Sequence, residues 1–100
     1  MTTTIQTKDN QVIASFIGRL DTAAAVEVAE AVKPLYAVAN REIILDCSQL
    51  EYISSSGLRI FLSIRKEAAA KGSKVIVRSI YDDIRQVFVM TGFISLFEIQ

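Results

Sequence analysis

The sequence predicts an α/β fold with a mixed central sheet of about five strands, helices packed against it and the element order ββαβαβαβ. Two observations support this class. The first residues alternate polar and apolar side chains in two short runs, as the strands of a hairpin do. After them, segments with helical periodicity alternate with short, continuously apolar runs, which favours buried and partly parallel strands.

The amino-terminal third contains a predicted hairpin and a helix. Residues 3–7 alternate polar and apolar side chains, which indicates an edge strand, and residues 12–17 resume as a second strand after a polar turn. Asp21 or Thr22 is placed to cap the next helix through a side-chain oxygen. Apolar side chains recur at helical spacing over residues 25–39, but Pro34 predicts a kink or break within that span.

The remaining elements follow from apolar runs and their end signals. The pattern predicts a strand covered on both faces over residues 42–47 and a loop over residues 48–53. Residues 58–71 are predicted to form a long helix that ends at Gly72. Residues 74–78 form another buried strand. The segment from residue 79 to residue 99 predicts a helix capped by Ser79, with Asp82 and Asp83 in its first turn, and a short final strand beyond Gly92.

Composition bounds the function. The chain has 100 residues, of which 51% are hydrophobic, so we expect one domain spanning residues 1–100. Lysine plus arginine number 11 and aspartate plus glutamate number 11, which argues against a surface that binds nucleic acid directly. The single Cys47 and the lack of a secretory signature favour the cytoplasm, and we expect no insertion into a membrane.

The same composition disfavours an enzyme. The sequence contains no histidine, so neither a serine–histidine nor a thiol–imidazole pair can form. One cysteine without histidine leaves only carboxylates as metal ligands, and the pair Asp82-Asp83 is better explained as charge at a helix start. No phosphate-binding or dinucleotide-binding glycine motif is present. We therefore expect no cofactor and no metal.

The most informative segment runs from Asp46 to Arg59. A buried strand leads to the cluster Ser54-Ser55-Ser56-Gly57 at the start of a helix. One serine there is enough to cap the helix, and the glycine would ease a tight turn. Three hydroxyls exceed the need for a cap, so we expect at least one to face solvent, where a kinase could reach it.

These residues resemble the STAS family (sulphate transporter and anti-sigma factor antagonist), in particular the small stand-alone antagonists of bacteria. The resemblance is carried by Asp46 to Leu58, which is similar to the family's acidic strand end, serine loop and Asp-Ser-Ser-Gly-Leu motif. Gly18-Arg19-Leu20-Asp21 resembles a second family element, and Val89-Met90-Thr91-Gly92-Phe93 a third.

The resemblance implies a phosphorylation site. In the family, the serine that follows the motif's aspartate is phosphorylated by a partner that is both an anti-sigma factor and a serine kinase. That position is Ser55 here. Ser54 stands where the family has aspartate, so Ser54 and Ser56 are competing acceptors.

The leading hypothesis is an anti-sigma factor antagonist. It would bind an anti-sigma factor that is a serine kinase, release the sigma factor, and lose binding on phosphorylation. The expected partner-binding residues surround the serine cluster: Asp21, Thr22, Ser54, Ser56, Gly57, Leu58 and Arg59. At Gly57 we expect the partner to approach the backbone closely. The alternative is an accessory subunit of a membrane ABC transporter of the lipid-transport type.

Overall fold

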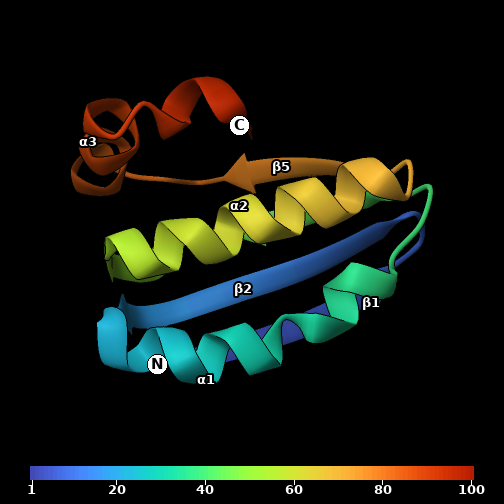
Figure 1. The fold of residues 1–100 in the computed structure, drawn as a ribbon, viewed down its shortest axis with the longest axis horizontal. Coiled ribbons are helices and arrows are strands. Elements are labelled where there is room, and N and C mark those ends of the chain that lie inside the picture. Colours follow the sequence, from blue (N-terminus) through green and yellow to red (C-terminus); the bar gives the residue numbers. More distant parts are fainter.

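The computed structural model describes residues 1–100, which form a mixed sheet with helices on one face (Figure 1). The sheet has six strands in the order β1-β2-β3-β5-β6, with β4 paired to β2. Only the β1–β2 pair is antiparallel. The elements in chain order are β1 Thr2–Lys8, β2 Gln11–Leu20, α1 Thr22–Ala31, the 3-10 helix η1 Lys33–Ala37, β3 Glu42–Asp46, β4 Leu50–Ile53, α2 Ser55–Ala70, β5 Lys74–Arg78, α3 Asp82–Met90, the 3-10 helix η2 Phe93–Leu96 and β6 Glu98–Ile99.

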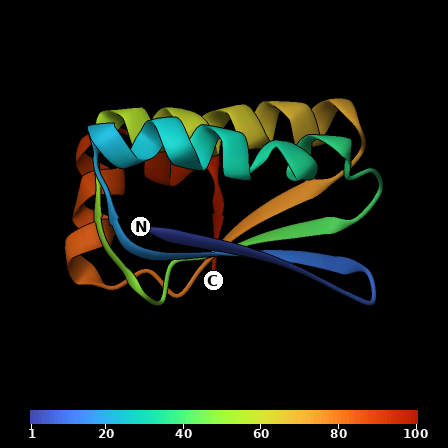
Figure 2. The same cartoon turned by 90° about the horizontal axis from the view of Figure 1, so that it is seen from below.

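Two layers make the molecule. Figure 2 shows α1 and α2 side by side over one face of the sheet, with α3 at the end of the molecule where α2 begins. The core lies between the layers. Its largest side chains are Phe16 from β2, Phe61 from α2 and Phe88 from α3, with ring centroids 5.0 Å apart for Phe16–Phe61 and 6.3 Å for Phe61–Phe88.

The amino-terminal predictions are confirmed. β1 and β2 form a hairpin with Lys8 opposite Gln11, and β1 lies at the sheet edge. Asp21 is the N-cap of α1, because its Oδ1 accepts a hydrogen bond from Ala24 N at 2.8 Å. The helical pattern that continues to residue 39 breaks after Ala31, and Pro34 occupies the first turn of η1, where its missing N–H costs nothing.

The predicted loop over residues 48–53 is wrong in part, since residues 50–53 form β4. Leu50 and Ile53 are buried while Glu51 and Tyr52 between them are exposed, a pattern that lacks strand alternation. The strand exists because β2 extends beyond the last residue that it pairs with β3, which is Ser15. Gly18, with φ +108°, bends β2 at a register shift, and β4 pairs with its last residues. The element order therefore has one more strand than predicted.

Two helix boundaries also differ from the prediction. α2 begins at Ser55 rather than Leu58, because Ser54 caps it. Ser79 does not cap α3; Tyr81 stands at the N-cap, and Ser79 has a φ of +64° with its N–H donating to Gln100 O at 3.0 Å. Gly72 ends α2 with a φ of +71°, as expected, and the final strand is only Glu98–Ile99.

Candidate functional site

The site is formed where two parallel strands end side by side. β2 and β4 pair in parallel with Leu20 opposite Ile53, and Ser54 N donates to Leu20 O at 2.8 Å. The residue that follows each strand caps a helix: Asp21 caps α1 and Ser54 caps α2. The amino-terminal ends of α1 and α2 are therefore adjacent, and both direct free N–H groups and positive partial charge toward this end of the molecule.

Ser54 is a structural residue. Its side-chain oxygen accepts a hydrogen bond from Gly57 N at 3.2 Å, and the residue is only 8% exposed. A kinase needs the acceptor hydroxyl free and accessible, and this hydroxyl is neither. Ser54, one of the two competing acceptors predicted from the sequence, is therefore buried and engaged as a helix cap.

Ser55 and Ser56 differ from Ser54 in exposure. Ser55 is the first residue of α2 and is exposed, whereas Ser56 is half-buried. A negative charge at the first turn of a helix is favoured by the helix dipole and by the free N–H groups there. Of the three hydroxyls, that of Ser55 is the most accessible and lies where a phosphate is well tolerated.

Gly57 and Leu58, two of the expected contact residues, lie in the interior of the protein. A Cβ at Gly57 would lie 2.7 Å from Leu20 Cγ and 2.9 Å from Ile53 Cγ1, so the start of α2 packs directly on the ends of β2 and β4. Leu58 is 1% exposed. The glycine provides space for packing within the chain, and both residues contribute to the core rather than to the exposed surface.

Only some of the residues expected to contact a partner are exposed to solvent. Thr22 and Arg59 are exposed, while Asp21 is half-buried and its carboxylate is engaged as a cap. Arg59 lies four residues after Ser55, so both side chains occupy one face of α2. Thr22, Ser55 and Arg59 form the surface that we call the helix-start surface.

An adjacent pair of side chains was missed by sequence reasoning. The Arg19 guanidinium lies 4.6 Å from the centroid of the Tyr52 ring, and the two residues are register partners across β2 and β4. Both are exposed, one residue before Leu20 and Ile53, so they point to the other face of the sheet. No local signal could have paired them, because residues 48–53 lack strand periodicity.

The one cysteine of the protein, Cys47, lies beside this end and is buried. Burial and the neighbouring Asp46 carboxylate raise the pKa of the Cys47 thiol to about 12, so it is protonated at neutral pH and is a poor nucleophile. The structure contains no cluster of three or more cysteine and acidic side chains with the spacing of a metal site. No helix has the length and apolar character needed to cross a bilayer.

Comparison with known proteins places this arrangement in a family. The family model described as STAS domain matches residues 2–100. This chain belongs to the STAS family.

Several relatives resemble this STAS domain over nearly its whole length. BtrV of Bordetella bronchiseptica, assigned as an anti-sigma factor antagonist, is 28% identical over 99 residues, covering 99% of this chain and 85% of BtrV. A STAS domain protein from Planctomyces limnophilus superposes with a TM-score of 0.89 at 14% identity, covering 98% of this chain and 87% of that one.

The anti-sigma factor antagonist SpoIIAA of Bacillus is known in both covalent states. Its unphosphorylated form matches with a TM-score of 0.74 at 19% identity, covering 99% of this chain and 87% of that one. Its phosphorylated form matches with a TM-score of 0.73 at 20% identity, covering 99% and 91%. At these identities the likeness establishes the fold.

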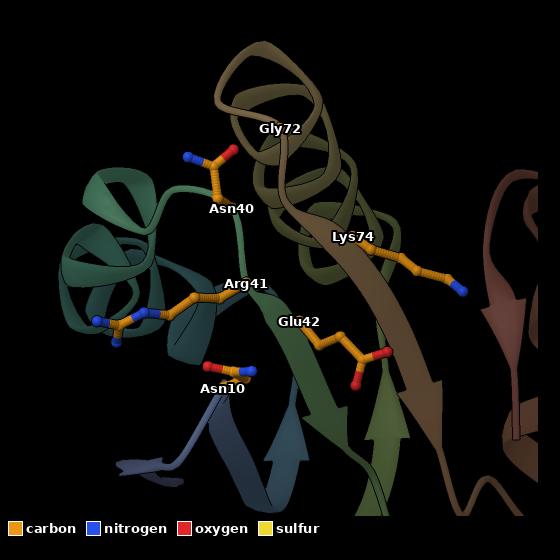
Figure 3. Close-up of a pocket in the computed structure, with 6 residues that line it drawn as sticks. All are labelled: Asn10, Asn40, Arg41, Glu42, Gly72 and Lys74. Carbon is orange, nitrogen blue, oxygen red and sulfur yellow. The ribbon is translucent and has the colours of Figure 1, made fainter.

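A depression lies at the opposite end of this STAS domain from the helix-start surface, at the amino ends of β3 and β5 (Figure 3). Arg41 and Lys74 point to opposite sides of it, and Lys74 forms an ion pair with Glu98 at 2.9 Å. Glu42 accepts a hydrogen bond from Gln11 at 2.9 Å. Because the two cations diverge, the depression lacks the converging donors that an anion site requires.

Proposed function

We propose that this protein is an anti-sigma factor antagonist that binds an anti-sigma factor through the helix-start surface, in the cytoplasm, where sigma factors act. The anti-sigma factor would also be the serine kinase that phosphorylates Ser55, and phosphorylation would end binding. The observation that carries the proposal is the exposure of Ser55 at the first position of α2, between a buried cap and a half-buried neighbour. The resemblance to BtrV supports the same function.

The switch is electrostatic. A phosphate on Ser55 adds about −1.5 to −2 charges at neutral pH. The start of α2 stabilises that charge, so the modification leaves the fold intact. A partner surface that had accepted a neutral hydroxyl would then have to bury an unpaired dianion, which costs several kcal/mol and lowers affinity by two or more orders of magnitude.

Arg59 gives the switch a second component. Its guanidinium has no ion-pair partner within the chain and lies on the face of α2 that carries Ser55. A phosphate on Ser55 would attract it, as opposite charges at i and i+4 do. Phosphorylation would thus withdraw from the partner a cation that the unmodified surface offers.

The test begins with mass spectrometry of the protein from its own cell. We expect phosphate on Ser55 and none on Ser54, and affinity capture with the Ser55→Ala variant should retain an ATP-binding anti-sigma factor. Binding of that factor is then measured by calorimetry. Ser55→Asp should weaken binding about a hundredfold or more, with thermal unfolding close to that of the parent.

Ser63→Asp is the matched control, because Ser63 is also an exposed serine of α2 and lies two turns further along. It should bind as the parent does. Capture of no ATP-binding anti-sigma factor would refute the proposal, and so would a Ser55→Asp variant that binds as tightly as the parent.

The transporter-subunit alternative shares the fold, so the fold does not discriminate between the two functions. The 28% identity with BtrV favours the antagonist. Neighbouring genes provide a direct discriminator, since sigma-factor regulators and ABC transporter subunits are encoded beside different partners.

A further inference from the structure

The two edges of the sheet differ in how well they are protected. At one edge, β6 has only two residues, and its Glu98 forms an ion pair with Lys74. Short strands and charges are the usual ways in which proteins prevent an edge from pairing with another chain. That edge offers little to a partner strand.

The other edge has none of these protections over most of its length. β1 runs for seven residues, Thr2–Lys8, and pairs with β2 in unbroken register with no bulge. It contains no proline and is dominated by β-branched residues, and its one charge, Lys8, is the last residue. β1 is the edge strand of the sheet, and its extensive contacts are with β2 alone. Such an edge is a template for strand addition.

The hairpin geometry determines which groups of β1 are free. A two-residue turn makes Lys8 and Gln11 the pair that exchanges hydrogen bonds, and such pairs alternate along an antiparallel ladder. Gln6, Thr4 and Thr2 therefore also bond to β2. The N–H and C=O groups of Thr3, Ile5 and Thr7 point away from the sheet and are available to another strand.

We propose that this edge pairs with β1 of a second copy of the chain, antiparallel about a two-fold axis at Ile5. In that register Ile5 faces Ile5 of the other copy and Thr3 faces its Thr7, so every free backbone group of these three residues is satisfied. The remaining opposite pairs are Thr2 with Lys8 and Thr4 with Gln6.

The sequence of β1 suits pairing with a second copy of itself, because its single charge meets no like charge across the axis. In the symmetric register each Lys8 faces the hydroxyl of a Thr2, so no like charges stand opposite each other. Ile5 is half-buried against the core on the helix side, so pairing Ile5 with itself extends the apolar layer across the axis. The result is one continuous sheet shared by two molecules.

The geometry keeps this association compatible with partner binding. The helix-start surface follows the carboxyl end of β2, which lies beside the Thr2 end of β1. An antiparallel pairing places the two helix-start surfaces at opposite ends of the joint sheet. A single edge strand buries less than a standard interface, so the dimer is weak and exchanges rapidly.

Sedimentation velocity from about 10 µM to about 1 mM tests the proposal on the intact chain, a range chosen for a weak interface. We expect reversible dimerisation. Thr2→Lys places two like-charged pairs across the axis and should weaken the dimer about threefold to thirtyfold, whereas Thr2→Glu creates two attractive pairs and should strengthen it. Thr2 is exposed, so neither change disturbs the monomer. Adding Lys8→Glu to Thr2→Lys should restore dimerisation.

Cysteine crosslinking tests the register independently. Ile5→Cys should form a disulfide-linked dimer on mild oxidation, because the two-fold axis brings this position opposite itself within disulfide reach. Thr3→Cys, which faces Thr7, should not, and the native Cys47 is buried. A chain that stays monomeric throughout would overturn the proposal. Equal effects of Thr2→Lys and Thr2→Glu, or equal crosslinking of the two cysteine variants, would overturn it as well.

Discussion

Three neighbouring hydroxyl groups, those of Ser54, Ser55 and Ser56, differ in their surroundings rather than in their chemistry. The first lies between the end of β4 and the start of α2, where it satisfies Gly57 N. The second faces solvent and the third is half-buried. The change from strand to helix at Ser54 thus gives one serine a structural role and leaves the next accessible.

Removal of the cap should measure that structural role. Ser54→Ala leaves Gly57 N without its side-chain acceptor and should lower the free energy of unfolding by about 1 kcal/mol. Ser54→Asp should retain most of the stability, since aspartate is an equally good N-cap. Urea denaturation of both variants checks this, with Ser55→Ala as the control because that side chain is exposed. Equal losses for Ser54→Ala and Ser54→Asp would show that the hydroxyl does not act as a cap.

At the scale of elements, the position of α2 depends on the absence of a side chain. Gly57 lies against Leu20 and Ile53, the last residues of two paired strands, with no room for a Cβ. That close approach brings Ser55 to the same end as Thr22. The helix-start surface therefore exists because β2, β4 and α2 meet at one glycine.

Gly57→Ala should destabilise the protein despite alanine's higher helix propensity. The new methyl would lie under 3.0 Å from buried Leu20 and Ile53 carbons, and overpacking of about 1–3 kcal/mol outweighs a propensity gain of roughly 1 kcal/mol. Leu20→Val should relieve part of the conflict, so the double variant should be more stable than the sum of the single effects predicts. Thermal unfolding of the parent, the two single variants and the double variant gives the double-mutant cycle that measures this coupling. A fully additive result would contradict direct packing of Gly57 on Leu20.

In the whole molecule, α1 and α2 cover only one face of the sheet. On the other face, side chains of the strands themselves shield the apolar residues from solvent. Ile44 and Ile76, register partners on β3 and β5, are 1% and 2% exposed although they lie outside the main core cluster. The next rung toward the site is the ion pair of Asp46 with Arg78, 3.2 Å apart. Charged side chains thus flank an apolar row.

Asp46 makes stability depend on pH at the acid end. Partial burial acts to raise the pKa of this carboxyl, but hydrogen bonds from Ser48 and the Arg78 guanidinium outweigh it, so the pKa lies below its ordinary value of 3.8. A depressed carboxyl pKa contributes stability above the unfolded-state value, and that contribution is lost as the pH falls through the folded-state value.

We therefore expect Asp46→Asn to be less stable than the parent at neutral pH and to converge with it as the pH falls through the lowered pKa of Asp46. Chemical denaturation across this range measures the difference. Arg78→Gln should reproduce part of the neutral-pH loss, because it removes one of the groups that hold the carboxylate. A gap between Asp46→Asn and the parent that stays constant with pH would contradict the linkage.

The sequence by itself determined most elements of this protein. Alternation predicted the β1–β2 hairpin, continuous apolar runs predicted β3 and β5, and Pro34 predicted the break after α1. These signals are local, since each depends on side chains a few residues apart. The serine motif, through its resemblance to the STAS family, also located the candidate site.

Only the tertiary structure decided what is accessible there. β4 forms because Leu50 and Ile53 meet β2 across space, and nothing in four residues with an irregular pattern indicates that partner. The same contact buries Ser54, Gly57 and Leu58 and leaves Thr22, Ser55 and Arg59 exposed. Burial depends on which distant segments pack together. Local periodicity does not show which strands far apart in the sequence will pair, so it could not predict which of these residues are buried.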